Sequence, residues 1–178
     1  WPAIVEAATL VRTLLEKIGL QGFLKTTGGK GLHVVLPVEP TLRWEAAKGF
    51  SKAVADLLCQ TFPDRFTPSI SRASRRGRMF IDYLRNAEGS TAVAAYSLRA
   101  RANAPVPTPI SWSELRRDVR FDHFNAKNLL RRLARRKHDP WASFFSLRQA
   151  ITADMMQQVG YAAGGASPAE QRRRWRRR

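Results

Sequence analysis

A glycine-rich segment, TTGGKGLHVVLPV at residues 26–38, combines residue types that suit anion binding. Its paired glycines let backbone N–H groups turn toward an anion, and Lys30 beside them suits phosphate. Thr27 adds a hydroxyl group, and His33 follows where a strand is expected to begin. A tight turn that leads into a buried strand explains the same residues. This segment alone leaves both interpretations open.

A second candidate for chemistry is Asp82, in the segment RMFIDYLRN. The alternation of this segment predicts a strand, with Asp82 on a largely apolar face. A carboxylate in such a place costs free energy unless a metal ion or a cationic side chain compensates it. The spacing leaves two possibilities open, a metal ligand or an ion pair with Arg78 or Arg85.

The strongest global signal is charge. The chain has 31 Lys and Arg against 14 Asp and Glu, which gives a net charge of +17. This balance favours a polyanionic partner, with nucleic acid first and an acidic membrane second. Arginine outnumbers lysine, and guanidinium is the better bidentate ligand for phosphate. The cations cluster at residues 71–78, 129–137 and 172–178. Each cluster alone is best explained as a solvated face, but three clusters in one small chain favour nucleic acid.

Other features narrow the class of protein. No apolar run approaches 18 residues, so a transmembrane helix is not expected. The first 20 residues predict an amphipathic helix and not a signal peptide. Cys59 is the single cysteine, which favours a reducing, cytoplasmic location, and we expect association with the nucleoid. Cys59, His123 and His138 have no recognisable zinc-site spacing.

Hydrophobic periodicity predicts the elements that must position these residues. Helices are expected at 4–18, 44–62, 125–137 and 143–159, and strands at 32–38, 78–86 and 90–100, the last two forming a hairpin. Residues 22–31 are expected to form a loop, for which a short FLKT strand is one possible opening. Ser111 or Ser113 is expected to cap a short helix, since Glu114 lies three residues after Ser111. The core is expected to include Trp44, Phe50, Phe62, Phe66 and Trp141. The order of elements predicts one mixed α and β domain over 1–159, followed by a flexible basic tail at 160–178.

Three segments together resemble a known family. TTGGKGLHVVLP (26–37), GRMFIDYLRN (77–86) and STAVAAYSLRARANAPV (90–106) are similar to the primase-polymerase domain of bacterial DNA ligase D, in the archaeo-eukaryotic primase superfamily. The resemblance runs from Trp1 to about Trp141. The spacing of FIDYLRN and YSLRAR makes it specific, whereas the glycine-lysine loop alone is weak evidence.

The resemblance implies an α+β fold, with an antiparallel RNA-recognition-like sheet flanked by helices. It implies nucleotidyl transfer in DNA end joining, with Mn²⁺ or Mg²⁺, nucleoside triphosphates and DNA ends or gapped duplexes. Asp82 corresponds to the third metal-binding carboxylate, and hence to a catalytic residue. Thr27, Lys30, His33 and Arg99 correspond to the residues that bind the triphosphate, and Thr27 stands where the family usually has serine. Nearby cations are candidate DNA contacts: Arg75, Arg76, Arg78 and Arg85.

The sequence departs from the family pattern in one respect. The family's first two metal ligands form an Asp-x-Asp pair ahead of the first helix seen here, and these 178 residues contain no such pair. Asp118 and Asp122 lie far downstream of the expected place. We therefore expect a domain truncated at its N-terminus and inactive alone, which needs a second chain to supply the Asp-x-Asp segment, and a ligase partner. The alternative is a non-catalytic, basic nucleic-acid-binding module, with affinity that depends on salt but not on metal.

Overall fold

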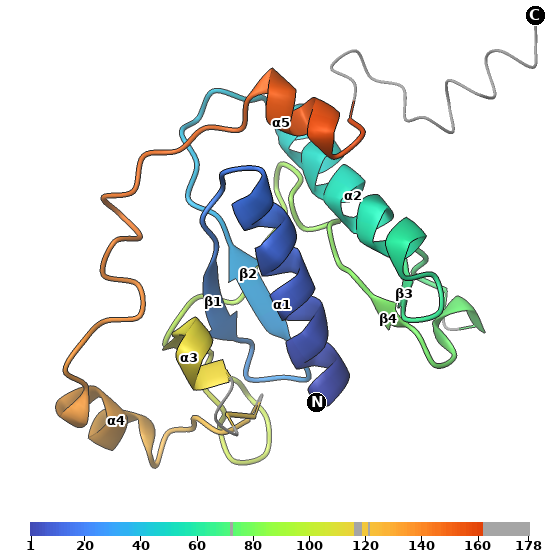
Figure 1. The fold of residues 1–178 in the computed structure, drawn as a ribbon. Helices are drawn as coiled ribbons and strands as arrows, with labels where there is room; N and C mark the ends of the chain where they lie inside the picture. The colour runs from blue at the N-terminus through green and yellow to red at the C-terminus, as the bar shows by residue number, and fades with distance from the viewer. Residues whose placement is uncertain (72, 116–118, 121, 162–178) are drawn as a thin grey trace, which may run out of the picture. The chain divides into compact units, whose positions relative to one another are not determined.

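The computed structural model describes residues 1–71, 73–115, 119–120 and 122–161. The chain divides into two compact units, each built from two stretches of sequence. Unit 1 consists of Trp1–Pro37 and Ala92–Gln149, and unit 2 of Val38–Thr91 and Ala150–Arg178. Helices and a small antiparallel sheet confirm the α+β prediction (Figure 1).

Unit 1 is organised around a three-stranded antiparallel sheet. The strands are β1 (Phe23–Thr26), β2 (Leu32–Val35) and β5 (Pro109–Ile110), in the order β2-β1-β5. Leu24 lies opposite Val34 on one side and Ile110 on the other, so these three side chains share one face. That face packs with Ala8 of α1 (Pro2–Lys17) in the hydrophobic core, and α1 lies across the sheet in Figure 1. The periodicity of residues 4–18 therefore predicted this helix correctly.

A short helix, α3 (Trp112–Leu115), follows β5 directly. The Ser111 N–H donates to the Glu114 carboxylate at 2.7 Å, and the Glu114 N–H donates to the Ser111 hydroxyl at 3.1 Å. This reciprocal pair is the capping box that the Ser111–Glu114 spacing predicts. Glu114 also forms a 2.5 Å ion pair with Arg132 of α4 (Leu129–Arg135), which ties the two helices together.

The carboxyl group of Glu114 is expected to make the stability of the folded chain depend on pH. Burial raises the pKa of its carboxyl, but the bonds from Arg132 and Ser111 outweigh burial and hold the pKa below its usual 4.5. Because the folded-state pKa is depressed, the unfolded state takes up the proton first as the pH falls. We therefore expect ionised Glu114 to contribute fully to the free energy of unfolding above pH 4.5. This contribution is lost as the pH falls through the folded-state pKa of Glu114.

Urea unfolding between pH 7 and pH 3 measures this contribution. Glu114→Gln is expected to lower the free energy of unfolding at pH 7 by about 1.5–3 kcal/mol, the usual value of a hydrogen bond to a charged group. The substitution should also make the free energy of unfolding depend less on pH between pH 5 and pH 3. Glu88→Gln is the matched control, because Glu88 is exposed. Identical pH profiles for both variants would contradict this role of Glu114.

Unit 2 is built on α2 (Trp44–Thr61), close to the predicted 44–62. Its strands β3 (Phe66–Thr67) and β4 (Met79–Phe80) pair in parallel, with the short 3-10 helix η1 (Ala73–Arg75) between them. A second helix of this unit, α5 (Ala153–Gln158), lies beside α2 in Figure 1. A Cβ atom at Gly49 of α2 would come within 2.5 Å of the Tyr161 ring, so glycine leaves room for this ring just after α5.

The predicted hairpin over 78–86 and 90–100 is wrong. The first strand is reduced to β4, and residues beyond it form turns. The second segment lies instead beside residues 105–107, where Tyr96 N–H donates to Pro107 and Arg99 N–H to Pro105. Proline has no N–H to return these bonds, so a regular ladder cannot form along this segment.

Two further expectations differ from the structure. The helix predicted at 143–159 is present only as α5, and residues 143–152 form turns and extended chain. Among the aromatic residues, Phe50 and Phe66 are buried and Phe62 and Trp141 half-buried, but Trp44 is 54% exposed. The predicted tail at 160–178 lies almost wholly outside the described residues. In the part of the chain that the structure describes, no helix has the length and apolar character needed to span a bilayer.

Candidate functional site

The glycine-rich segment forms a closed loop between β1 and β2. The Thr27 hydroxyl donates to the Gly31 carbonyl at 2.9 Å and accepts from the N–H groups of Gly29 at 3.2 Å and Gly31 at 3.3 Å. The backbone N–H of Thr27 also donates to the Gly31 carbonyl. The side chain of Thr27 therefore stabilises the turn, and its contact with a triphosphate stays a prediction.

Arg99 packs directly against this loop. Its Nη1 donates to the Thr27 carbonyl at 2.8 Å, so two predicted site residues, 72 positions apart, meet in unit 1. Gly28 has φ +57°, and a Cβ there would meet the Arg99 Cδ at 3.1 Å and the Pro105 carbonyl at 3.3 Å. A Cβ at Gly29 would lie 3.0 Å from the Arg99 Nη1. Glycine at both positions lets the guanidinium approach the backbone closely.

Lys30 is the exposed cation of the loop. Among the described residues, neither its ammonium nor its backbone N–H has a hydrogen-bond partner, and the same holds for the N–H of Gly28. These donors, with the Arg99 side chain beside them, are the groups that remain available to an anion. A loop of this kind can bind phosphate oxygens through backbone N–H groups and nearby cations.

The sheet face opposite α1 carries His33 and an additional lysine, Lys25. The two lie directly opposite each other on β2 and β1, and His33 is half-buried. Lys25 is only 5% exposed, its ammonium donates to the Val93 carbonyl, and burial lowers its pKa. This bond fastens the segment that leads to Arg99 onto the sheet.

Sequence reasoning did not single out Lys25 or Arg101. Lys25 interrupts the otherwise apolar start of the FLKT strand, and this break in the pattern was the available signal. Arg101 is the second arginine of YSLRAR, and its Nη1 lies 3.8 Å from the position of a Cβ on Gly29. The loop is thus bordered by two guanidinium groups.

Asp82 belongs to unit 2 and is not in a strand. Its side chain is 47% exposed, one carboxylate oxygen accepts from the Leu84 N–H at 3.0 Å, and the other lies 3.8 Å from Nε of Arg85. The prediction that Asp82 lies on a largely apolar strand face is wrong. A turn after β4 brings side chains three positions apart together. The ion pair with Arg85 is one of the two alternatives that the spacing left open.

The metal prediction concerns Asp82. A divalent cation such as Mg²⁺ takes about six oxygen ligands, and Asp82 supplies one carboxylate. Across residues 1–71, 73–115, 119–120 and 122–161, no cluster of three or more His, Cys, Asp or Glu side chains could hold a metal ion. These residues therefore do not by themselves form a site for the Mn²⁺ or Mg²⁺ that the resemblance implies.

The predicted DNA contacts lie in unit 2. The Arg75 guanidinium stacks over the Phe80 ring at 4.5 Å, and Arg78 donates to the Pro63 carbonyl at 3.5 Å. Arg76 and Arg85 are exposed, although Arg85 also donates to the Thr91 carbonyl. Their contact with DNA stays a prediction.

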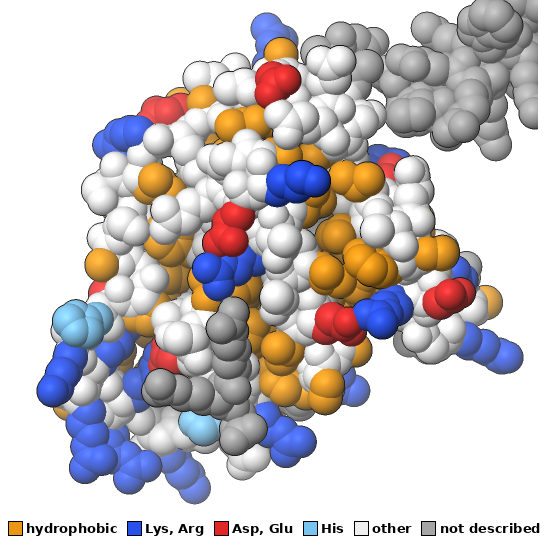
Figure 2. Space-filling model, viewed as in Figure 1, with side chains coloured by type: hydrophobic (Ala, Val, Ile, Leu, Met, Phe, Trp, Pro, Cys, Tyr) orange, Lys and Arg blue, Asp and Glu red, His pale blue; other side chains and the backbone are white. Residues whose placement is uncertain are grey.

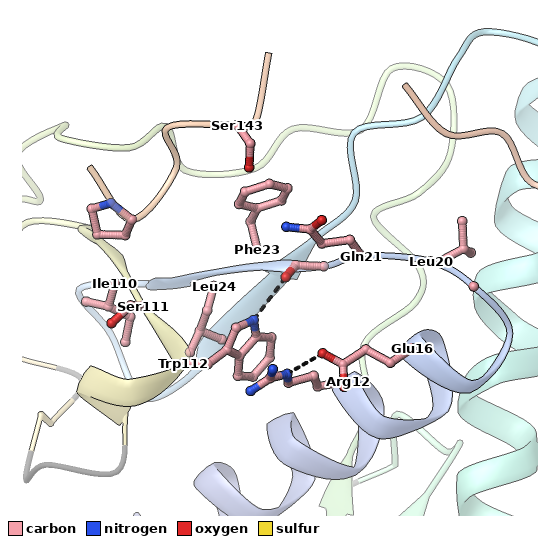
Figure 3. Close-up of a pocket in the computed structure, with 13 residues that line it drawn as sticks. Arg12, Glu16, Leu20, Gln21, Phe23, Leu24, Ile110, Ser111, Trp112 and Ser143 are labelled. Carbon is pink, nitrogen blue, oxygen red and sulfur yellow. Dashed lines mark hydrogen bonds and ion pairs between the residues drawn. The ribbon is translucent and has the colours of Figure 1, made fainter. Parts of the chain in front are cut away.

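Unit 1 also holds a pocket of about 470 Å³ between α1, β1 and α3. Figure 3 shows the indole of Trp112 among the lining residues, where it donates to the Gly22 carbonyl at 3.0 Å beside the Arg12–Glu16 ion pair. None of Thr27, Lys30, His33 and Arg99 is among its lining residues. The pocket is therefore separate from the predicted site.

Comparison with known proteins shows what the chain is similar to. The family described as "LigD, primase-polymerase domain" matches residues 1–141. The multifunctional non-homologous end joining protein LigD of Pseudomonas aeruginosa is 40% identical over 161 residues, which are 90% of this chain and 19% of that protein. The bifunctional non-homologous end joining protein LigD of Bacillus subtilis is 27% identical over 142 residues, which are 79% of this chain and 23% of that protein.

A solved structure agrees with these matches. The polymerase domain of Mycobacterium tuberculosis ligase D, determined in complex with DNA, superposes with a TM-score of 0.70 at 35% identity. The match covers 75% of this chain and 46% of that one. This chain thus spans about a fifth of the length of the LigD relatives and about half of the solved domain. The family match, the identity and the shared fold agree, and the chain belongs to the LigD primase-polymerase domain family.

Proposed function

We propose that the chain takes part in nucleotidyl transfer at DNA ends and that its loop at residues 26–31 binds the triphosphate of the incoming nucleotide. The observation that carries the proposal is the closed loop with Arg99 fastened to it and Lys30 exposed at its tip. Thr27 holds the loop in shape, and His33 follows on β2. Membership of the family supports the assignment to end joining.

In this proposal each residue has a distinct task. Lys30 and Arg99 neutralise phosphate oxygens through charge-assisted hydrogen bonds. Asp82 is proposed as one carboxylate ligand of Mn²⁺ or Mg²⁺, with further ligands from an Asp-x-Asp strand that these 178 residues do not contain. Such metal ions neutralise charge on the triphosphate when bound. DNA ends or gaps and nucleoside triphosphates are the proposed substrates.

Primer extension on a gapped duplex with a 5′-phosphate, manganese and ribonucleotides tests the proposal. We expect extension when a polypeptide that carries the Asp-x-Asp strand is added, such as the remainder of the P. aeruginosa polymerase domain. Asp82→Asn and Lys30→Gln should each reduce it at least tenfold, and Arg120→Gln, which alters an exposed arginine, should not. Extension that survives both site substitutions would contradict the proposal.

A non-catalytic nucleic-acid-binding module is the second candidate. The observation that favours it is the net charge of +17, spread over several clusters. Such a module would bind DNA with an affinity that falls steeply with salt and does not respond to manganese. DNA binding without extension under any of these conditions would favour it over the enzyme.

A further inference from the structure

The helix α4 and the turns beside it form a strongly basic part of unit 1. Residues 122–139 contain six Lys and Arg but only two Asp, so this short stretch has a net charge of +4. Figure 2 shows Lys and Arg side chains gathered where α4 lies in Figure 1. The loop at 26–31 is a different part of this unit, so the basic stretch requires its own explanation.

Two of the six cations stabilise the fold. Arg132 pairs with Glu114 at 2.5 Å, stacks over the Phe124 ring at 4.4 Å and is only 18% exposed. Arg136 donates to the Tyr96 hydroxyl at 3.0 Å and pairs with Asp139 at 3.2 Å. These contacts hold α4 in place, so it presents its outer side chains from a fixed position.

The other four have no such task. Lys127, Arg131, Arg135 and Lys137, named here the α4 cationic surface, are exposed, and none of their side chains has a hydrogen-bond or ion-pair partner within the described ranges. Arg131 and Arg135 are four residues apart on one helix, so their Cβ atoms lie about 6 Å apart on the same side of the helix. Like charges at this spacing destabilise a helix. A bound polyanion would remove that cost.

We propose that the α4 cationic surface binds the phosphate backbone of duplex DNA. Duplex DNA carries one negative charge for about every 1.7 Å of its axis, so several phosphates come within reach of these four side chains. Guanidinium groups suit phosphate oxygens. The identity of the partner rests on the proposed function, which places the chain at DNA ends. The binding itself requires neither nucleotide nor metal.

Salt-dependent binding of the full chain to a duplex, measured by fluorescence anisotropy in EDTA, tests the inference. Each phosphate contact contributes about 0.9 to the slope of log K against log salt. Arg131→Gln/Arg135→Gln should therefore reduce the slope by about 1.8. The binding assay contains neither nucleotide nor metal. Its result therefore stays interpretable even if the chain proves to have no nucleotidyl-transfer activity.

Matched variants separate a local contact from general charge. Lys17→Gln/Arg43→Gln removes the same number of exposed charges elsewhere and should leave the slope nearly unchanged. Arg131→Lys/Arg135→Lys keeps the charge and should restore most of the slope. Equal losses in both glutamine variants, or none in either, would overturn the inference. So would a loss confined to binding of vesicles with anionic phospholipid, since that would identify a membrane as the partner.

Discussion

Gly28→Ala is expected to lower the free energy of unfolding by about 1–3 kcal/mol, the usual cost of a side chain in the left-handed region. Gly28 has φ +57°, and its new Cβ would meet Arg99, Pro107 and the Pro105 carbonyl at 3.1–3.3 Å. The new Cβ would therefore press on the Arg99 side chain and on the backbone at Pro105. We therefore expect weaker triphosphate binding together with the lower stability. Urea unfolding and nucleotide titration measure the two effects.

Gly31→Ala in the same loop is the matched control. A Cβ on Gly31 would meet nothing within 4 Å, and its φ lies outside the positive range. We expect a change within about 1 kcal/mol, and in the stabilising direction, because alanine reduces the freedom of the unfolded chain. Equal losses at Gly28 and Gly31 would show that the close approach of Arg99 does not determine the stability of the loop.

Arg99→Gln is expected to weaken binding of a nucleoside triphosphate by about 10- to 100-fold, equivalent to about 1.4–2.8 kcal/mol. The substitution removes a cation beside the loop and its 2.8 Å hydrogen bond to the Thr27 carbonyl. Arg99→Lys keeps the charge but not the planar fork, so we expect it to recover only part of the affinity. Isothermal titration calorimetry of the wild type, Arg99→Lys and Arg99→Gln measures these affinities, which we expect to decrease in that order.

Arg120→Gln controls for net charge in the same experiment. Arg120 is exposed and lies in unit 1, like Arg99. We expect unchanged affinity for the triphosphate. A loss at Arg120 as large as that at Arg99 would mean that the triphosphate responds to overall charge and not to the loop.

Local rules predicted the parts of the fold that local forces determine. The apolar periodicity of α1 and α2 follows from the face that each helix buries, and the Ser111–Glu114 spacing predicted its capping box. The hairpin prediction was wrong because alternating apolar and polar residues do not show which strand a segment pairs with. Prolines at 105, 107 and 109 also limit pairing along residues 96–99. Trp44 was expected in the core because it is aromatic, but it is the first residue of α2 and is largely exposed.

The candidate site was predictable only in part. The residue types of the loop and the distant Arg99 were identified from sequence, and the structure brings them together. The bond from Lys25 to Val93 joins residues 68 positions apart, and no local pattern shows such a contact. Asp82 was expected on a largely apolar strand face, yet it is exposed and lies beyond the strand, because β4 ends at Phe80.

Titration of the chain with a nucleoside triphosphate and with the matching monophosphate tests most directly whether the loop at residues 26–31 binds the triphosphate. We predict at least about tenfold tighter binding of the triphosphate, a difference that Lys30→Gln removes. Because other arginines attract any polyphosphate, the comparison between wild type and Lys30→Gln isolates the loop. Equal affinities for the two nucleotides, or a preference that Lys30→Gln leaves intact, would contradict the account.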